Sequence, residues 1–447
     1  MLTVLSKLGI DKTVLFVLLS KGAGSISGVI TLLLIGHFLT PIEQGYYYTF
    51  ASILSLQIVF ELGFGSVLIQ FVSHEMVGVK ISHDNVTGNK ENLSRLYYII
   101  SLAIKWYFAV STIVLIVISP LGYLFFTTST IEALPTSTWL LPWLFLVFSA
   151  SLSLMITPVL SIAEGCGFVT DIARMRLSQA LCAAFLSWLA LLSGYGLYAT
   201  AATSAAIFIV GARWIKKYFY HVITAALKCP SKEKYSHIWK DEIFPMQWRI
   251  ALSWLSGYFI FQLFNPVAFR FFGATFAGQL GLSLSIVTLM TGVSLSWFMT
   301  KVPTFGRLIA DNKRVELDLL YKKTFKDSLL FLCFGAMVAI ISLFILDFNG
   351  YAFAQRFIEP SAFVLLVLTG IGNHIIACQA TYVRSHKVEK YLGNAIMTAL
   401  LMVALLFIST YFSENYIVYF YFMTVWLFFL PHATYIYRKF KQHYREK

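Results

Sequence analysis

Four charged residues interrupt long apolar segments of this chain, and their types predict two kinds of binding chemistry. Lys21, Lys105 and Arg249 could hold an anion, because ammonium groups and guanidinium forks donate charge-assisted hydrogen bonds to phosphate oxygens. Glu61 is the only carboxylate well inside such a segment. A carboxylate in apolar surroundings is expected to be ion-paired, protonated or bound to a cation. We therefore take the three cations as candidate substrate-binding residues and Glu61 as a candidate ion-coupling or ion-pairing residue.

Each of these residues also has a structural interpretation. Lys21 and Lys105 lie eight residues into their segments, which at 1.5 Å per residue is roughly 12 Å deep, and a lysine stem can reach the membrane interface from there. The same anchoring role fits Arg249, near the start of its segment. Lys21 differs because Gly22-Ala23-Gly24-Ser25 follows it, and such small side chains permit close helix approach or a cavity-facing surface. Glu61 could pair with Lys21, couple a proton or sodium ion, or hydrogen-bond within the helix packing.

Three uncharged polar positions are further candidates for a cavity. Asn265 precedes Pro266 inside an apolar segment, and Asn373 and His374 lie near the middle of another. These side chains could contact sugars, although helix–helix hydrogen bonding is the commoner use of such residues.

The motifs of several enzyme classes are absent from the sequence. There is no Gly-x-x-x-x-Gly-Lys-Ser/Thr loop, no His-Glu-x-x-His, no Cys-x-x-Cys and no Gly-x-Ser-x-Gly. We therefore predict no catalytic residues, no metal site and no cofactor, and expect no ATPase domain within the chain.

The composition indicates an integral membrane protein. Hydrophobic residues make up 58% of the 447 positions and charged residues only 12%, with a mean hydropathy of +0.74. Apolar stretches of about 20 residues suit helices that cross a bilayer, whereas barrel strands are about half that length. The predicted fold is therefore an all-α polytopic membrane protein. Twelve segments are candidate transmembrane helices: 13–38, 45–71, 97–126, 139–163, 176–194, 196–215, 247–269, 276–300, 328–346, 360–382, 391–410 and 415–437.

The distribution of basic residues predicts the orientation of these helices. Two of the 34 Lys and Arg residues, Arg270 and Arg356, fall in one set of connections between the segments. Another 29 fall in or beside the two tails and the alternate set of connections. Because basic residues are retained on the cytoplasmic side, both termini are predicted to be cytoplasmic in a multi-pass inner (plasma) membrane protein. This distribution also accounts for most of the net charge of +13, and without a compact basic domain no nucleic-acid partner is expected.

The chain contains signs of an internal duplication. Long basic connections at 72–96 and 301–327 follow the second and eighth segments, and an offset of 233 residues aligns Gly45 with Gly278 and Ser52 with Ser285. Each half would hold an even number of helices, so the halves would be parallel, as in alternating-access transporters with a site between two lobes. We predict two parallel six-helix lobes, 1–216 and 244–447, joined by a cytoplasmic linker at 217–243.

The second segment resembles a known family. The turn Leu39-Thr40-Pro41 and Glu43-Gln44-Gly45-Tyr46, followed by Glu61-Leu62-Gly63-Phe64-Gly65-Ser66, is similar to the polysaccharide-export branch of the multidrug/oligosaccharidyl-lipid/polysaccharide exporter superfamily. Thr40 stands where that branch usually has Gly, and Glu61 where Asp is common. The resemblance implies a flippase that moves undecaprenyl-pyrophosphate-linked oligosaccharide to the outer leaflet for O-antigen, capsule or related polysaccharide. It also implies that the chain lies in a lipid bilayer, that polysaccharide polymerase machinery is a partner, and that a proton or sodium gradient can drive transport.

Two other functions remain as alternatives. An ion-coupled multidrug antiporter of the same superfamily would attract cations with several buried carboxylates, but only Glu61 is available. A membrane polysaccharide polymerase or ligase would need a large outward-facing loop, whereas the longest outward connections predicted here have about a dozen residues. The sequence therefore favours a transporter over an enzyme.

Overall fold

The computed structural model describes residues 12–61, 63–76, 79–81, 86–129, 131–228, 239, 244–386 and 388–446. The amino-terminal tail and most of the predicted linker 217–243 lie outside these residues. The chain divides into two compact units. The first comprises Met1–Phe38, Ile53–Thr128 and Leu134–Leu255, and the second comprises Leu39–Ser52, Ser129–Ala133 and Ser256–Lys447. The predicted lobes were drawn from the sequence repeat, whereas these units are defined by the contacts within them. The boundaries of the lobes therefore stay a prediction.

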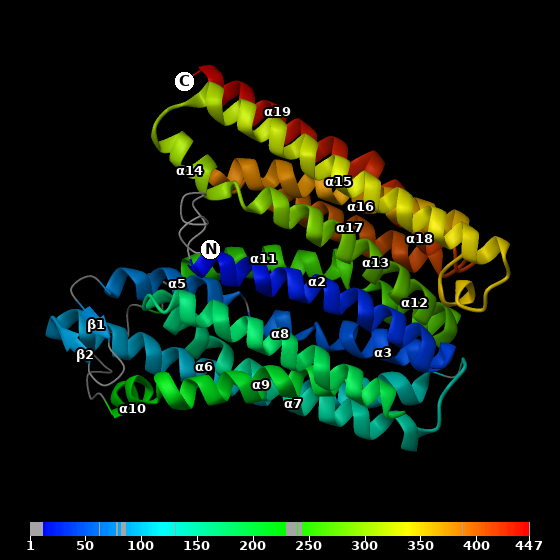
Figure 1. The fold of residues 1–447 in the computed structure, drawn as a ribbon, viewed down its shortest axis with the longest axis horizontal. Helices are drawn as coiled ribbons and strands as arrows, with labels where there is room; N and C mark the ends of the chain where they lie inside the picture. The colour runs from blue at the N-terminus through cyan, green and yellow to red at the C-terminus, as the bar shows by residue number, and fades with distance from the viewer. Residues whose placement is uncertain are drawn as a thin grey trace. The chain divides into compact units, whose positions relative to one another are not determined.

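Helices make up nearly all of the first unit (Figure 1). They are α2 (Lys12–Phe38), α4 (Gln57–Glu61), α5 (Phe64–Glu75), α6 (Lys90–Thr128), α7 (Thr136–Gly165), α8 (Val169–Leu192), α9 (Tyr198–Tyr218), α10 (Tyr220–Lys228) and most of α11 (Phe244–Phe261). The sequence did not predict the short antiparallel pair of β1 (Val79–Ile81) and β2 (Val86–Gly88) between α5 and α6.

The second unit is also helical. Its elements are α3 (Pro41–Leu54, up to Ser52), α12 (Phe264–Phe272), α13 (Ala274–Met299), α14 (Val302–Ala310), α15 (Arg314–Phe348), the 3-10 turn η2 (Ala354–Arg356), α16 (Pro360–Ser385), α17 (Leu392–Ser409), α18 (Tyr416–Met423), the π-helical turn η3 (Thr424–Phe429) and α19 (Leu430–Glu446).

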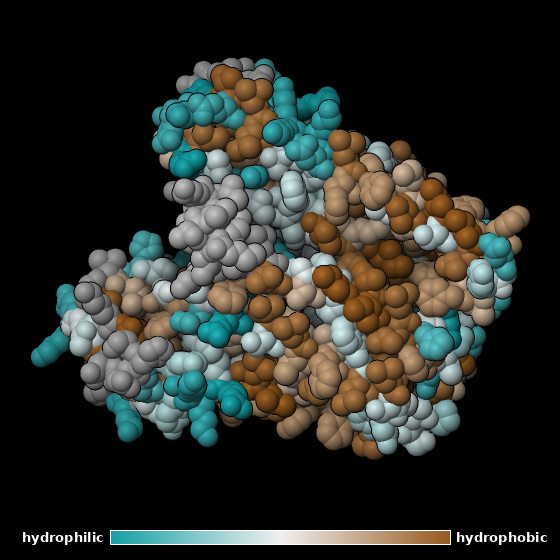
Figure 2. Space-filling model, in the orientation of Figure 1, coloured by the Kyte–Doolittle hydropathy of each residue, from teal (hydrophilic) through white to brown (hydrophobic). Residues whose placement is uncertain are grey.

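Ten helical segments of the described chain are long and apolar enough to cross a membrane. This confirms the all-α polytopic prediction. The count differs from twelve because two predicted spans are divided: 45–71 forms α3, α4 and α5, and 247–269 forms α11 and α12. On the face in Figure 2, hydrophilic residues gather at the end of the first unit that carries β1, β2 and α10, and apolar residues lie along its helices.

Both units repeat one packing order, which supports the predicted duplication. In the first, α6 packs on α7, α7 on α9, α9 on α8 and α8 on α2, while α5 contacts α6 and α7. In the second, α15 packs on α16, α16 on α18 and α19, α18 on α17 and α17 on α12, while α13 contacts α15 and α16. Helix α3 begins at residue 41 and α13 at residue 274, which is the sequence offset of 233.

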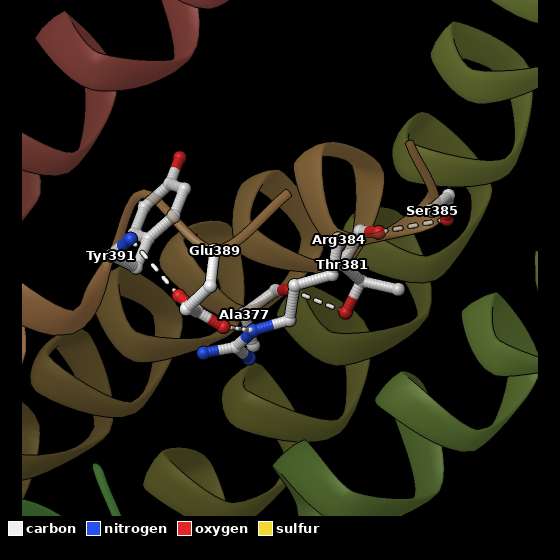
Figure 3. A network of polar contacts seen from close by, with 6 residues as sticks. All are labelled: Ala377, Thr381, Arg384, Ser385, Glu389 and Tyr391. Atoms are coloured by element: carbon white, nitrogen blue, oxygen red, sulfur yellow. Dashed lines mark hydrogen bonds and ion pairs between the residues drawn. The ribbon is translucent and has the colours of Figure 1, made fainter. Parts of the chain in front are cut away.

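Polar contacts fix the reversal between α16 and α17 (Figure 3). The Arg384 Nε donates to Glu389 Oε2 at 2.7 Å, and the other carboxylate oxygen accepts from the backbone N–H of Tyr391 at 3.0 Å. The hydroxyl of Tyr391 donates in turn to the carbonyl of Ala433 on α19. The carboxylate of Glu389 thus ties the end of α16 to the start of α17.

Two repeat-related glycines let α3 and α13 approach closely within the second unit. A Cβ on Gly45 would overlap the carbonyl oxygen of Ala274, and a Cβ on Gly278 would lie 2.8 Å from the backbone N of Gly45. The Gln44 side-chain amide also donates to the Gly278 carbonyl at 2.8 Å.

Gly45→Ala is expected to destabilise the protein because the added methyl group meets backbone that cannot rotate away. Overpacking of this kind costs about 1–3 kcal/mol. The midpoint of thermal unfolding in detergent measures the effect. Gly393→Ala is the matched control in the same unit, since no described atom outside its own helix backbone lies within 4 Å of its Cβ position. Equal midpoints for the two variants would contradict the close packing.

Candidate functional site

A break in the second span positions Glu61. Helix α4 ends at Glu61 and α5 begins at Phe64, with Gly63 between them at φ 64°. That left-handed conformation favours glycine, because a Cβ would strain the backbone. The Glu-Leu-Gly-Phe-Gly sequence therefore ends one helix and starts another within a single crossing. Interrupted helices of this kind form substrate and ion sites in transporters.

The carboxylate of Glu61 belongs to a small polar centre in the first unit. The Tyr107 hydroxyl on α6 donates to Glu61 Oε1 at 3.2 Å. The Cβ position of Gly65 lies 3.3 Å from Ser161 Oγ on α7, 3.5 Å from the Tyr107 hydroxyl and 3.8 Å from Glu61 Oε1. We call these four residues the Glu61 centre. Phe64 stacks on Tyr107 with ring centroids 6.1 Å apart, so an aromatic surface borders the centre.

The two candidate lysines are exposed on spanning helices of the first unit, Lys21 on α2 and Lys105 on α6. Neither forms an ion pair with a described residue, and Glu61 has its hydrogen bond from Tyr107 rather than an ion pair. Among the described residues, no atom outside the helix's own backbone lies within 4 Å of the Cβ positions of Gly22 and Gly24. These two glycines after Lys21 therefore pack against no described residue.

Arg249 lies on α11, but its side chain is outside the part of the chain that the structure describes. Its predicted role remains a prediction.

The uncharged candidates lie in the second unit and join its segments. Asn265 Nδ2 donates to Ser52 Oγ at 3.3 Å, and Asn373 Nδ2 donates to the Tyr421 hydroxyl at 2.9 Å. His374 is 2% exposed. The two bonds fit the structural interpretation of Asn265 and Asn373, while contact of any of the three residues with sugars stays untested.

A second polar centre surrounds His374. Its Nε2 lies 3.2 Å from Ser328 Oγ on α15, 3.5 Å from Ser294 Oγ on α13 and 3.6 Å from Cys378 Sγ. Nδ1 has no hydrogen-bond partner among the described residues. Nor do those residues contain a group of three or more His, Cys, Asp and Glu that could hold a metal ion.

The two centres occupy corresponding places in the two repeats. Ser294 follows Glu61 by 233 residues, and each centre joins the second, third and fourth spans of its repeat. Sequence reasoning missed Tyr107, Ser161 and Ser328 because hydroxyl side chains are common in membrane helices. The offset that aligned Gly45 with Gly278 could have found Ser294.

Solved membrane transporters share this arrangement over nearly the whole chain. An inward-facing multidrug resistance transporter of the MATE family and MOP superfamily gives a TM-score of 0.66 at 14% identity, covering 96% of both chains. The chain has the fold of that superfamily. The lipid II flippase MurJ, in an inward closed conformation, gives a TM-score of 0.63 at 13% identity, covering 94% of this chain and 87% of the flippase.

A third MOP superfamily structure, from Pyrococcus furiosus Vc1, gives a TM-score of 0.55 at 13% identity and covers 95% of this chain and 94% of its own. Its binding pocket is described as having reverse polarity, which suggests a different function for that protein. The sequence matches no protein-family model and no curated protein.

Proposed function

We propose that this protein is a flippase that moves an undecaprenyl-pyrophosphate-linked oligosaccharide from the cytoplasmic to the outer leaflet, for O-antigen, capsule or a related polysaccharide. The observation that carries the proposal is that Lys21 and Lys105 are exposed on spanning helices and have no ion pair with a described residue. A pyrophosphate brings several anionic oxygens into the membrane, and lysine neutralises such a charge. The fold shared with MurJ, itself a lipid II flippase, supports this substrate class.

In the proposed mechanism, the head group enters from the cytoplasmic side. Lys21 and Lys105 hold the pyrophosphate, with Arg249 as a third cation, and the lipid tail stays in the bilayer. Two parallel lobes then alternate access, as in other transporters built from repeats. The excess of basic residues in one set of connections supports cytoplasmic termini and an inner-membrane location.

Glu61 is proposed to couple this movement to a proton or sodium gradient. Its carboxylate ends an interrupted helix and accepts one hydrogen bond from a neutral hydroxyl. No described cation neutralises it, so a proton or sodium ion can.

The alternative function is an ion-coupled multidrug antiporter. The Glu61 centre and the fold shared with MATE transporters favour it. It is second because a cationic drug requires more anionic groups than one carboxylate supplies. A polymerase or ligase is less consistent with the short connections 129–135, 349–359 and 410–415.

Deleting the gene in its native cell tests the proposal. We expect the undecaprenyl-linked repeat unit to accumulate on the cytoplasmic face, because nothing carries it across. Chemical extraction measures the amount of the lipid-linked repeat unit. Labelling of its glycan in intact and in opened cells, without protease treatment, shows on which side of the membrane it lies. Unchanged surface glycan together with altered drug sensitivity would favour the antiporter instead.

A further inference from the structure

A basic pocket of about 360 Å³ lies between the start of α8 and the end of α9 in the first unit. Its lining includes Arg174 and Asp171 from α8, and Arg213, Lys217 and Trp214 from α9. Gln179 ties the two helices together beside it, donating to the carbonyl of Ile207 at 2.8 Å. The pocket is separate from the Glu61 centre, which lies among α4, α5, α6 and α7.

The charge of this pocket favours an anion. Three cations face one carboxylate, which leaves a net charge of +2. The guanidinium groups of Arg174 and Arg213 have no ion pair with a described residue, and Lys217 Nζ lies 4.8 Å from the ring centroid of Tyr218. Arg176, two positions from Arg174, is by contrast neutralised by Glu164 at 2.7 Å. With no ion pair among the described residues, Arg174 and Arg213 can bind phosphate oxygens in a bidentate manner.

Exposed apolar residues continue from the pocket, two along α8 and one on α9. On α8, Arg174 and Ser178 share a face with Leu181 and Phe185, which are 54% and 62% exposed. On α9, positions 217 and 213 share a face with Ile209, which is 57% exposed. Trp214 and Tyr218 are the residue types that mark the membrane interface. A phosphate with hydrocarbon chains attached fits this layout, because the chains can lie along these exposed apolar residues.

We propose that this pocket binds the headgroup of an anionic phospholipid, with Arg174, Arg213 and Lys217 on its phosphate. The acyl chains would lie along Leu181, Phe185 and Ile209. Basic pockets between membrane helices on the cytoplasmic side are suited to such headgroups. The proposal depends on α8 and α9 spanning the membrane, and it is independent of the transported substrate.

The test is a lipid titration of the full-length protein in detergent micelles, read by native mass spectrometry. The variant carries Arg174→Gln, Arg213→Gln and Lys217→Gln. The matched control carries Lys322→Gln, Lys323→Gln and Lys326→Gln, which removes three exposed cations from α15. We expect the pocket variant to bind phosphatidylglycerol about tenfold more weakly or worse, and the control to bind it as the wild type does.

Two further ligands define the chemistry of the pocket. Phosphatidylcholine, which carries a phosphate but no net charge, should bind the wild type more weakly than phosphatidylglycerol. Inorganic phosphate should not displace phosphatidylglycerol at equal concentration, and displacement would indicate a free-anion site and overturn the proposal. Unchanged phosphatidylglycerol binding by the pocket variant, or equal losses in variant and control, would also overturn it. Thermal unfolding of both triple variants confirms that each is folded before binding is compared.

Discussion

Glu61→Gln is expected to lower gradient-driven transport by about 5- to 150-fold, the range for a coupling free energy of about 1–3 kcal/mol. Glutamine keeps an oxygen that can accept the hydrogen bond from Tyr107, so the packing around the break is preserved. It can neither release a proton nor neutralise a sodium ion. Uptake of labelled substrate into proteoliposomes, with an imposed proton or sodium gradient, measures the loss.

Two further variants separate ion coupling from packing. Tyr107→Phe removes the hydrogen-bond donor but leaves the carboxylate, so a smaller loss is expected. Glu91→Gln, on the exposed first turn of α6, should transport like the wild type. If Glu61→Gln also transports normally while Glu61→Ala unfolds at lower temperature, then the carboxylate serves packing and the coupling role is wrong.

The double variant Lys21→Gln and Lys105→Gln is expected to reduce flipping of the lipid-linked oligosaccharide about a hundredfold or more. Each hydrogen bond to a charged group contributes about 1.5–3 kcal/mol, and about 1.4 kcal/mol corresponds to tenfold. Lys21→Arg and Lys105→Arg keep the positive charge and should retain most of the activity. The initial rate of flipping in proteoliposomes at low substrate concentration measures these effects.

Lys90→Gln is the control for the lysine variants, because Lys90 opens the same helix as Lys105 but lies before the apolar segment. It should leave the flipping rate unchanged. A double variant as active as the Lys90→Gln protein would assign Lys21 and Lys105 to membrane anchoring, and the pyrophosphate would then need another set of cations.

The helical membrane fold could be predicted from the sequence because the length and apolar composition of a segment identify it as a membrane helix. The exceptions have local causes. Its continuous hydropathy predicts one span for segment 45–71, yet α3 ends at Leu54, and Gly63 takes a left-handed conformation that separates α4 from α5. The grouping of most of α3 with the second unit also could not be predicted. It depends on close packing between Gly45 and residues of α13 that are distant in sequence.

The candidate site was only partly predictable. Charged residues inside apolar segments are rare, so Lys21, Lys105 and Glu61 were visible at once. Their partners were not, since the Tyr107 hydroxyl that meets Glu61 lies on another helix, 46 residues away. That hydrogen bond fits the third interpretation of Glu61, hydrogen bonding within the helix packing, and the ion-coupling role stays a prediction. The repeat offset recovers only one position of the two polar centres, since it maps Glu61 onto Ser294.

The central claim is tested most directly by the wild-type protein in proteoliposomes that contain a fluorescent undecaprenyl-pyrophosphate oligosaccharide. A membrane-impermeant quencher reports how much of the label lies in the outer leaflet. With a flippase present, nearly all of the label should become accessible to the quencher, because molecules from the inner leaflet are carried across. Label that stays protected to the same extent as in protein-free liposomes, while the same vesicles transport a cationic dye, would contradict the flippase and identify an antiporter.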